Sequence, residues 1–425
     1  MTVSTTGPFK ASGFSLIELM VAMLISLIIM AGVINSFIAS RDAYHYNEQL
    51  AFIQENARFA IGKLSADIRE AGNFGCRNDS PHDLTTGASD NDWYANNLVS
   101  ALNQSSNVFY KRTGLQGFSQ NTAGIHLPSN VNVSNVVGDA VLVRRGDNDN
   151  ALTVKNHDGP KGHVFTLTAK HSYKPGTLMV YADANCRYQG IFQLAGPAES
   201  SLPSDQVDHQ AGVSGAAPGN KTVLLLGQLA VGGGSFLLGD YSECNSTTDC
   251  SWWPGGASEA GAGTSAAVDY LPGSLVMPMS SNLYYVARST VDPNMNSLYV
   301  VGLDNGGALA SAQELVLGVD DMRIFYGVDT DAIADGMANR YVTAADIGTH
   351  DYAALGATNN YLVWNRVVSV RVQLLLSSRN RVLTNPAQGF TWDDDSDALT
   401  EAQKHDGYLR QLISTTVQLR DAFKG

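Results

Sequence analysis

The chain has 425 residues, 44% of them hydrophobic and 16% charged, which is enough apolar material for one large domain or two modest ones. Its 27 lysines and arginines against 40 aspartates and glutamates give a formal net charge of −13. A protein this acidic lacks the basic surface that displaces counterions from nucleic acid, so we expect no direct nucleic-acid binding.

The N-terminus begins with a short polar leader that ends at Gly13 and runs into an apolar segment with one carboxylate, Glu18, near its start. The apolar character continues over residues 16–38, which matches the roughly 20 residues that a membrane span needs. A carboxylate is costly in hydrocarbon and is seldom kept there without a role. A secretory signal would instead place its apolar core before a small-residue cleavage site. The segment therefore predicts a membrane anchor in which Glu18 has a specific task.

The run Gly13-Phe14-Ser15-Leu16-Ile17-Glu18 resembles the prepilin signature of type IV filament systems. The resemblance implies that a prepilin peptidase removes the leader, residues 1–13, by cutting after Gly13, and then methylates the new amino terminus at Phe14. It also implies that Glu18 pairs with the terminal amine of a neighbouring subunit as a filament grows. This pairing is physically reasonable, because burying a lone carboxylate costs free energy and a positively charged partner offsets much of that cost. A plain signal anchor with a stray glutamate is the alternative.

After the apolar segment the pattern stays helical but becomes amphipathic. Apolar residues recur every three or four positions, while charged residues, Asp67 among them, lie largely elsewhere around the helix. Gly72 and Gly75 then provide a stop, because glycine accepts the left-handed conformation that ends helices. The predicted ranges are 14–75 for the whole helical segment, 14–39 for its transmembrane part and 40–72 for its amphipathic part. We expect the amphipathic part to pack against a globular domain.

Residues 76–425 have the pattern of β-strands between irregular loops. Apolar and polar residues alternate most clearly over 368–376 and 413–420. Because helices are not regularly interposed, mostly antiparallel sheets are favoured over βαβ units. Stretches rich in Gly, Ala and Ser at 195–220 and 231–265 predict loops. Further strand candidates are 140–145, 177–181, 222–226, 283–287, 298–301 and 322–326. The predicted fold class is α+β, with a long N-terminal helix on a β-rich domain.

Four cysteines lie beyond the anchor, which exports the rest of the chain to an oxidising compartment, so disulfides are the default. Cys244 and Cys250 bracket a short polar loop that favours local closure. That pairing leaves Cys76, just past the helix, to bridge Cys186 and tie the helix end to the β domain. A metal site is the rival interpretation, but the sequence contains no Cys-x-x-Cys motif.

Several segments carry a narrower resemblance. They are Gly318-Val319-Asp320-Asp321-Met322-Arg323-Ile324-Phe325-Tyr326-Gly327-Val328-Asp329, Trp364-Asn365-Arg366-Val367-Val368-Ser369-Val370-Arg371-Val372, Thr415-Thr416-Val417-Gln418-Leu419-Arg420, Asp139-Ala140-Val141-Leu142-Val143-Arg144 and Ala184-Asn185-Cys186. Together they are similar to the PilW family of type IV pilus minor pilins, whose fold has a long N-terminal helix docked on a β-rich domain. The match is weakest across 195–275, where the Gly-rich loops lie.

The resemblance implies assembly rather than catalysis. PilW-type subunits are thought to form, with other minor pilins, a complex that initiates pilus assembly and sits at the pilus tip, where an adhesin is carried. The implied partners are the other minor pilins, the major pilin, the prepilin peptidase and the inner-membrane assembly platform. The implied location is a single pass through the inner membrane with the C-terminal domain in the periplasm, and later the pilus. Twitching, adhesion and DNA uptake remain open as roles of that pilus.

Two alternatives stay open. The chain also resembles the J-type pseudopilins of type II secretion. The alternative from another class is a membrane-anchored adhesin or glycan-binding module that uses the aromatic pair Trp252 and Trp253 as a partner contact. Burial of these tryptophans within the Gly-rich loop is the simpler interpretation, because aromatic side chains bring large apolar area.

A search for active sites finds no Gly-x-Ser-x-Gly or His-Glu-x-x-His motif, and we expect no enzyme and no cofactor. The weak metal candidate is a calcium loop formed by Asp329, Asp331 and Asp335, because calcium prefers several oxygen ligands on a turn. The spacing departs from the EF-hand, and a solvated acidic turn is the alternative. The histidines at 157, 163 and 171 lack ligand-like spacing and are interpreted as surface or loop residues.

Overall fold

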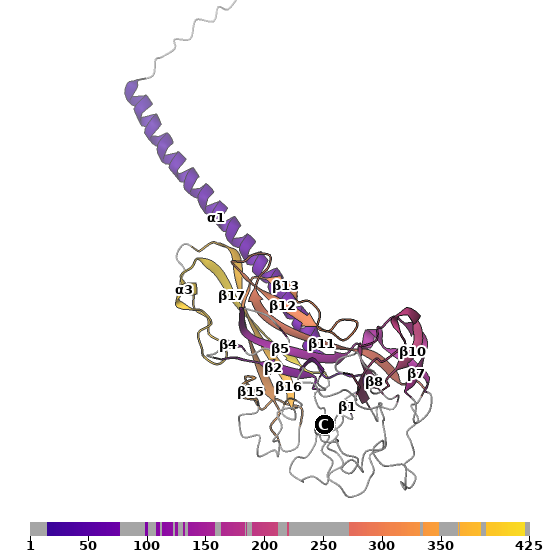
Figure 1. Ribbon diagram of the computed structural model, residues 1–425. Helices are drawn as coiled ribbons and strands as arrows, with labels where there is room; N and C mark the ends of the chain where they lie inside the picture. Colours follow the sequence, from indigo (N-terminus) through magenta and orange to yellow (C-terminus); the bar gives the residue numbers. More distant parts are fainter. Residues whose placement is uncertain are drawn as a thin grey trace, which may run out of the picture.

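The computed structural model consists of one long helix that projects from a β-rich body (Figure 1). The residues that it describes are 15–76, 98–100, 108–110, 113–121, 124–125, 131, 135–157, 163–182, 184, 189–210, 219–220, 272–331, 335–347, 364, 366–383 and 388–420. The predicted leader, the strand candidate 222–226 and the Gly-rich stretch 231–265 lie outside them.

Helix α1, Leu16–Arg69, has 54 residues and is therefore about 81 Å long at a rise of ~1.5 Å per residue. Its first part, up to residue 48, is exposed along its whole length. Burial begins at Gln49, nine residues later than the start of the predicted amphipathic part. The buried positions then recur every three or four residues, which places one stripe of the helix on the β body: Gln49, Ile53, Ala57, Ala60, Leu64, Asp67 and Ile68.

The described strands form two main sheets and one small ribbon. The first strands are β1 Leu98–Ser100, β2 Leu115–Phe118, β3 Gln120–Asn121, β4 Gly124–Ile125, β5 Val136–Gly146, β6 Leu152–His157, β7 Val164–His171, β8 Leu178–Ala182, β9 Gln189–Gln193 and β10 Ser204–Asp208. The later ones are β11 Leu275–Arg288, β12 Asn296–Gly302, β13 Gln313–Leu317, β14 Val319–Val328, β15 Arg340–Val342, β16 Val367–Arg381 and β17 Tyr408–Gln418. Short helices are η1 Val108–Tyr110, η2 Asn148–Asn150, η3 Glu199–Ser201 and α3 Glu401–Lys404.

The larger sheet is organised around the long strand β11, which pairs with β5, β6, β8 and β12. The smaller sheet has the order β15-β14-β16-β17. Every pairing among the described strands is antiparallel except that of β1 with β9. The α+β fold class with a long N-terminal helix and mostly antiparallel sheets is therefore confirmed.

Helix α1 lies against β16, β17 and β13, and its apolar stripe shares one core with both sheets (Figure 1). The opposite face of the smaller sheet is also covered, because Trp392, Ala398 and Leu399 pack with Leu375 of β16. Strand β16 is consequently buried on both faces. Even Gln373, one of the polar residues that alternate with apolar ones along this strand, is only 3% exposed.

The helix ends earlier than predicted, at Arg69, and Gly72 follows it with a φ of +82°. The main-chain N–H of Gly72 donates to the carbonyl of Arg144, so the turn after the helix is tied to β5.

The prediction of a continuous loop over 195–220 is wrong in one part. Residues Ser204–Asp208 form β10, which pairs with β7. This segment is almost entirely polar, so its pattern did not suggest a strand, and only Val207 enters the apolar cluster beneath it.

Candidate functional site

The exposed half of α1 is the most unusual surface of the protein. Between residues 16 and 40 the sequence contains one charged residue, Glu18, and the large apolar side chains there are 43% to 77% exposed. A soluble domain rarely leaves so much contiguous apolar area open to water. In the described part of the chain, α1 is the helix long and apolar enough to cross a membrane. This half of the helix needs either lipid or neighbouring subunits around it.

Glu18 lies in the first turn of α1 and is exposed there among apolar neighbours. A carboxylate near a helix N-terminus is favoured by the positive end of the helix dipole. In the described part of the chain no cation lies within ion-pairing distance of Glu18. Gly13 and Phe14, the predicted cleavage and methylation positions, lie outside the described residues. Glu18 is thus placed on the apolar helix half, and its pairing with the amine of a neighbouring subunit stays a prediction.

A second polar residue of α1, Asp67, is buried where the helix meets the β body. Its Oδ2 accepts hydrogen bonds from the hydroxyl of Tyr284 and from Nδ2 of Asn282, the latter at 3.3 Å. Its Oδ1 lies 3.4 Å from Nζ of Lys63 and 3.8 Å from Nη2 of Arg145. Burial, then the charge of Asp67, raises the pKa of Tyr284, so the hydroxyl keeps its proton and remains a donor. The helix is therefore held on β11 by a buried side chain whose two carboxylate oxygens both have partners.

Sequence reasoning missed this role, since it grouped Asp67 with residues lying off the apolar stripe. Asp67 is 4% exposed and follows the buried Leu64 by three positions, within the stripe that faces the sheets. No local signal marks it, because Tyr284 lies 217 residues away. Two further contacts fix the helix register: Asn56 Nδ2 donates to the carbonyl of Leu317 at 2.9 Å, and Gln49 Oε1 accepts from the N–H of Asn380 at 3.0 Å.

Cys76 is buried and disulfide-bonded. The turn that carries it is pressed onto β8: a side chain built at Gly75, whose φ is +95°, would meet Ala182 at 2.8 Å and Met277 at 2.7 Å. Cys186 follows the last residue of β8 by four positions, and it lies outside the described residues together with Cys244 and Cys250. The position of Cys76 beside the end of β8 favours the Cys76–Cys186 pairing, which stays a prediction, as does Cys244–Cys250.

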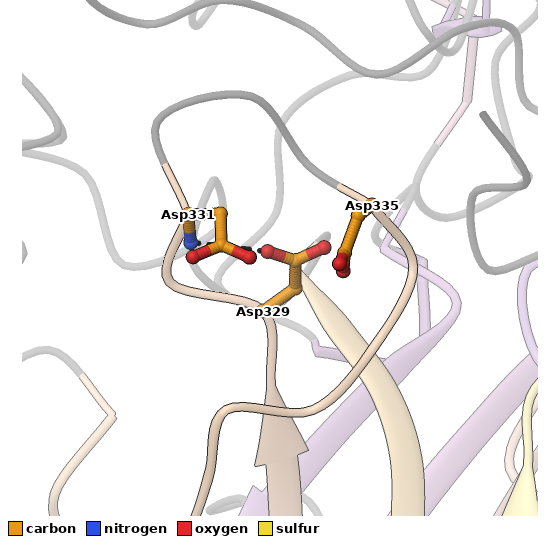
Figure 2. A group of neighbouring side chains, drawn as sticks. All are labelled: Asp329, Asp331 and Asp335. Carbon is orange, nitrogen blue, oxygen red and sulfur yellow. Dashed lines mark hydrogen bonds between the residues drawn. The ribbon is translucent and has the colours of Figure 1, made fainter.

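Asp329, Asp331 and Asp335 lie around one loop after β14, with carboxylate oxygens within 4.8 Å of one another (Figure 2). The buried Asp329 already accepts from the N–H groups of Asp331 at 3.1 Å and Gly336 at 2.8 Å. Arg366 Nη1 lies 3.8 Å from Asp329 Oδ1 and donates to the carbonyl of Asp331 at 3.2 Å. Burial lowers the pKa of Arg366. The negative charges of Asp329 and Asp331 counteract that effect by favouring the charged guanidinium. A guanidinium thus supplies part of the positive charge that a calcium ion would bring.

Two of the three histidines predicted at the surface are buried instead, whereas the side chain of His163 is 37% exposed. His157 and His171 are buried, and Nε2 of His157 lies 3.2 Å from Nε2 of the equally buried His209. The rings of His157 and His209 pack on Phe165 in the core between β7 and β9, so they fill a polar-aromatic core rather than a loop. Trp252 and Trp253, the predicted partner contact, lie outside the described residues.

Comparison with known proteins matches both ends of the chain. Residues 283–421 match the family described as Type IV Pilus-assembly protein W, or PilW. Residues 8–34 match the prokaryotic N-terminal methylation motif, which spans the predicted cleavage position. No curated protein matches the chain.

Among solved structures the chain is similar to a type IV-like pilin from Thermus thermophilus. The two share 17% identity and a TM-score of 0.19 over 34% of this chain and 69% of that one. The PilW match covers the last part of β11 and all of β12 to β17, which include the sheet on which α1 packs, and the methylation motif covers the start of the exposed half of α1. The chain is thus similar to the PilW family over residues 283–421 and to methylation-type N-termini over residues 8–34.

Proposed function

We propose that this chain is a minor pilin that takes part in the initiation of type IV pilus assembly and in the complex at the pilus tip. The observation that carries the proposal is the division of α1 into two halves. One half is apolar, exposed and marked by Glu18, and the other is fixed on the β body by Asp67 and the apolar stripe. Such a helix joins a membrane or filament core to a domain that is held outside it.

The protein acts in this proposal through assembly, and its chemistry is done by others. A prepilin peptidase cuts after Gly13 and methylates Phe14, and Glu18 then pairs with the amine of a neighbouring subunit. Before assembly the chain crosses the inner membrane once, with the β body in the periplasm. The partners are the other minor pilins, the major pilin, the assembly platform and a tip adhesin. The family match to a pilus-assembly protein supports this structural role over catalysis.

The decisive experiment compares the major pilin sheared from cells that lack this gene with that from complemented cells. Loss of surface pilin that returns on complementation supports a role in initiation or at the tip. Unchanged piliation would contradict the proposal. It would favour a type II secretion pseudopilin, or an anchored adhesin that uses Trp252 and Trp253.

A further inference from the structure

Strand β17 forms an outer edge of the smaller sheet, with β16 on one side. The N–H of Leu419 donates to the carbonyl of Val368, so these two residues form a hydrogen-bonded pair of the antiparallel ladder. Such pairs alternate along a ladder, and the register between β16 and β17 is unbroken from Ser369 to Ser377. The odd-numbered residues of β17 therefore bond to β16, and the even-numbered ones direct their N–H and C=O groups outward.

The outward groups at the two ends of this edge are already satisfied. At the start, the side-chain amide of Gln388 donates to the carbonyl of Tyr408 at 2.6 Å and accepts from the N–H of Arg410 at 2.9 Å. At the end, the N–H of Arg420 donates to the carbonyl of Arg69, the last residue of α1, at 2.8 Å. Gln388 thus pairs with β17 as the main chain of another strand would.

Between these two ends, four consecutive outward positions have no main-chain partner within the described parts of the chain: Leu412, Ser414, Thr416 and Gln418. They span about 20 Å at ~3.3 Å per residue. The sequence from Gln411 to Leu419, Gln-Leu-Ile-Ser-Thr-Thr-Val-Gln-Leu, contains no charged residue and no proline. Natural proteins protect long edges against pairing with charges, prolines or bulges, and this stretch has none of these.

The two faces of the open edge differ in polarity. Ile413 and Val417 belong to the core that α1 covers, and Ile413 is only partly buried there, as is Ile61 of the helix. On the other face Ser414 and Thr416 are exposed, and Leu412 is partly buried against the cluster of Trp392 and Leu375. A strand added to β17 would satisfy the outward groups and would need apolar side chains toward α1 and polar ones on the other face beside Ser414 and Thr416.

We propose that β17 accepts an extended segment of a different filament subunit, which adds a fifth strand to the sheet beside α1. This inference rests on the proposed function and names the contact by which the subunit would join its neighbour. The recognition is main-chain pairing along four outward positions, from Leu412 to Gln418, and alternating side chains set its register.

A second copy of this chain whose β17 pairs antiparallel with this one fits the edge poorly. Two β17 strands paired antiparallel, with both α1 helices on the same face of the joined sheet, are related by a two-fold axis normal to that sheet. The axis reverses the direction of α1, so the two apolar halves would point to opposite sides and could not share one membrane. A different subunit can supply a strand while its own helix runs parallel to α1.

The test uses the full chain in the cells that assemble the filament. A photo-crosslinking amino acid, p-benzoyl-phenylalanine, replaces Ser414, and the same probe at Asn294, exposed on the β11–β12 turn, is the control. Adducts are identified by mass spectrometry. Each probe is combined with one of two substitutions at Thr416. Thr416→Pro removes an outward N–H without breaking the ladder to β16, and Thr416→Ala is the control that keeps that N–H.

The expected adduct joins Ser414 to another filament subunit. Thr416→Ala should leave its yield near wild type, whereas Thr416→Pro should lower it about fivefold or more, the effect of one lost net hydrogen bond. Thr416→Lys, which keeps the N–H but places a charge at the edge, should also lower it. Thermal unfolding of the full-length variants in detergent identifies any variant that fails to fold, and Thr416→Lys then replaces Thr416→Pro.

Wild-type adduct yields in folded Thr416→Pro and Thr416→Lys would overturn the inference, as would an adduct to a second copy or no protein adduct at all. Failure here is distinct from failure of the proposed function. If the gene deletion removes surface pilin but folded Thr416→Pro and Thr416→Lys cells keep both normal pilin and normal adducts, only the edge contact is wrong. If the deletion leaves piliation unchanged, the proposed function is wrong.

Discussion

The hydroxyl of Tyr284 on β11 donates a hydrogen bond to the buried carboxylate of Asp67 on α1, across 217 residues of sequence. Removing the donor leaves a buried charge with weaker partners, so Tyr284→Phe should lower the free energy of unfolding by about 1–3 kcal/mol. Asp67→Asn should also destabilise the protein, because Lys63 and Arg145 then lose their anion. The measurement is denaturant unfolding of the full chain in detergent. A double-mutant cycle with no coupling between the two positions would contradict the assigned contact.

Substitution of Gly13 tests the predicted processing position. Gly13→Val adds a branched side chain where the peptidase is expected to cut, so the chain should keep its leader and migrate as the larger, unprocessed form. Immunoblots and intact-mass measurement distinguish the two forms and show whether Phe14 carries the methyl group. A Gly13→Val chain that is cut and assembled normally would remove the prepilin interpretation.

Glu18 is predicted to act after processing rather than in it. Glu18→Ala should leave cleavage intact but reduce incorporation into sheared filaments several-fold, because the neighbour's amine then enters the apolar core without a counter-charge. Glu18→Gln is the matched control for size and should fail in the same way, since it also removes the charge. Normal incorporation of either variant would remove the pairing argument.

The disulfide pairing is open to direct measurement. Cys76 is bonded and lies against the end of β8, so non-reducing peptide mapping should recover a Cys76–Cys186 peptide and a Cys244–Cys250 peptide. Cys186→Ser should destabilise the junction between α1 and β8, by about 2–5 kcal/mol if it behaves as other native disulfides do. Recovery of Cys76 bonded to Cys244 or Cys250 would refute the assignment.

Calcium is the remaining question at the loop of Asp329, Asp331 and Asp335. Because the guanidinium of Arg366 already faces Asp329, we expect calorimetry of the full chain to detect no calcium uptake. Arg366→Gln removes the competing cation and is the informative comparison. Uptake of calcium by the wild-type chain that disappears in Asp329→Asn would establish the site.

The structural features that could be predicted from the sequence are those encoded by a pattern within one contiguous stretch of the chain. The periodic stripe from Ile53 to Ile68 predicts which side of α1 is buried, and the structure confirms it. The motif of the leader, Gly13 and Glu18 is equally local, and its roles stay predictions. Strands with clear alternation, such as β16 and β17, were also predictable because one face of each covers the helix-side core.

The features that it did not reveal depend on partners far away in the chain. Asp67 and Gln49 look like surface residues of an amphipathic helix until Tyr284 and Asn380 are brought to them. Gln388 has no pattern of its own, and its strand-like pairing with β17 exists only in the folded sheet. Buried polar contacts between distant residues leave no local periodicity, so propensity and pattern alone cannot locate them.

The point at which α1 first touches the β body has a mechanical consequence. The apolar segment ends near residue 40 and the first buried side chain is Gln49, so residues 41–48 form a bare helical stalk about 12 Å long. The helix is continuous across this stalk, and Asp67 fixes its C-terminal end on the β body. A tilt or rotation of the apolar half is therefore transmitted through the helix to the sheets. The orientation of the β body therefore follows that of the apolar helix half, and a force on the body is transmitted along α1 to the turn that carries Glu18.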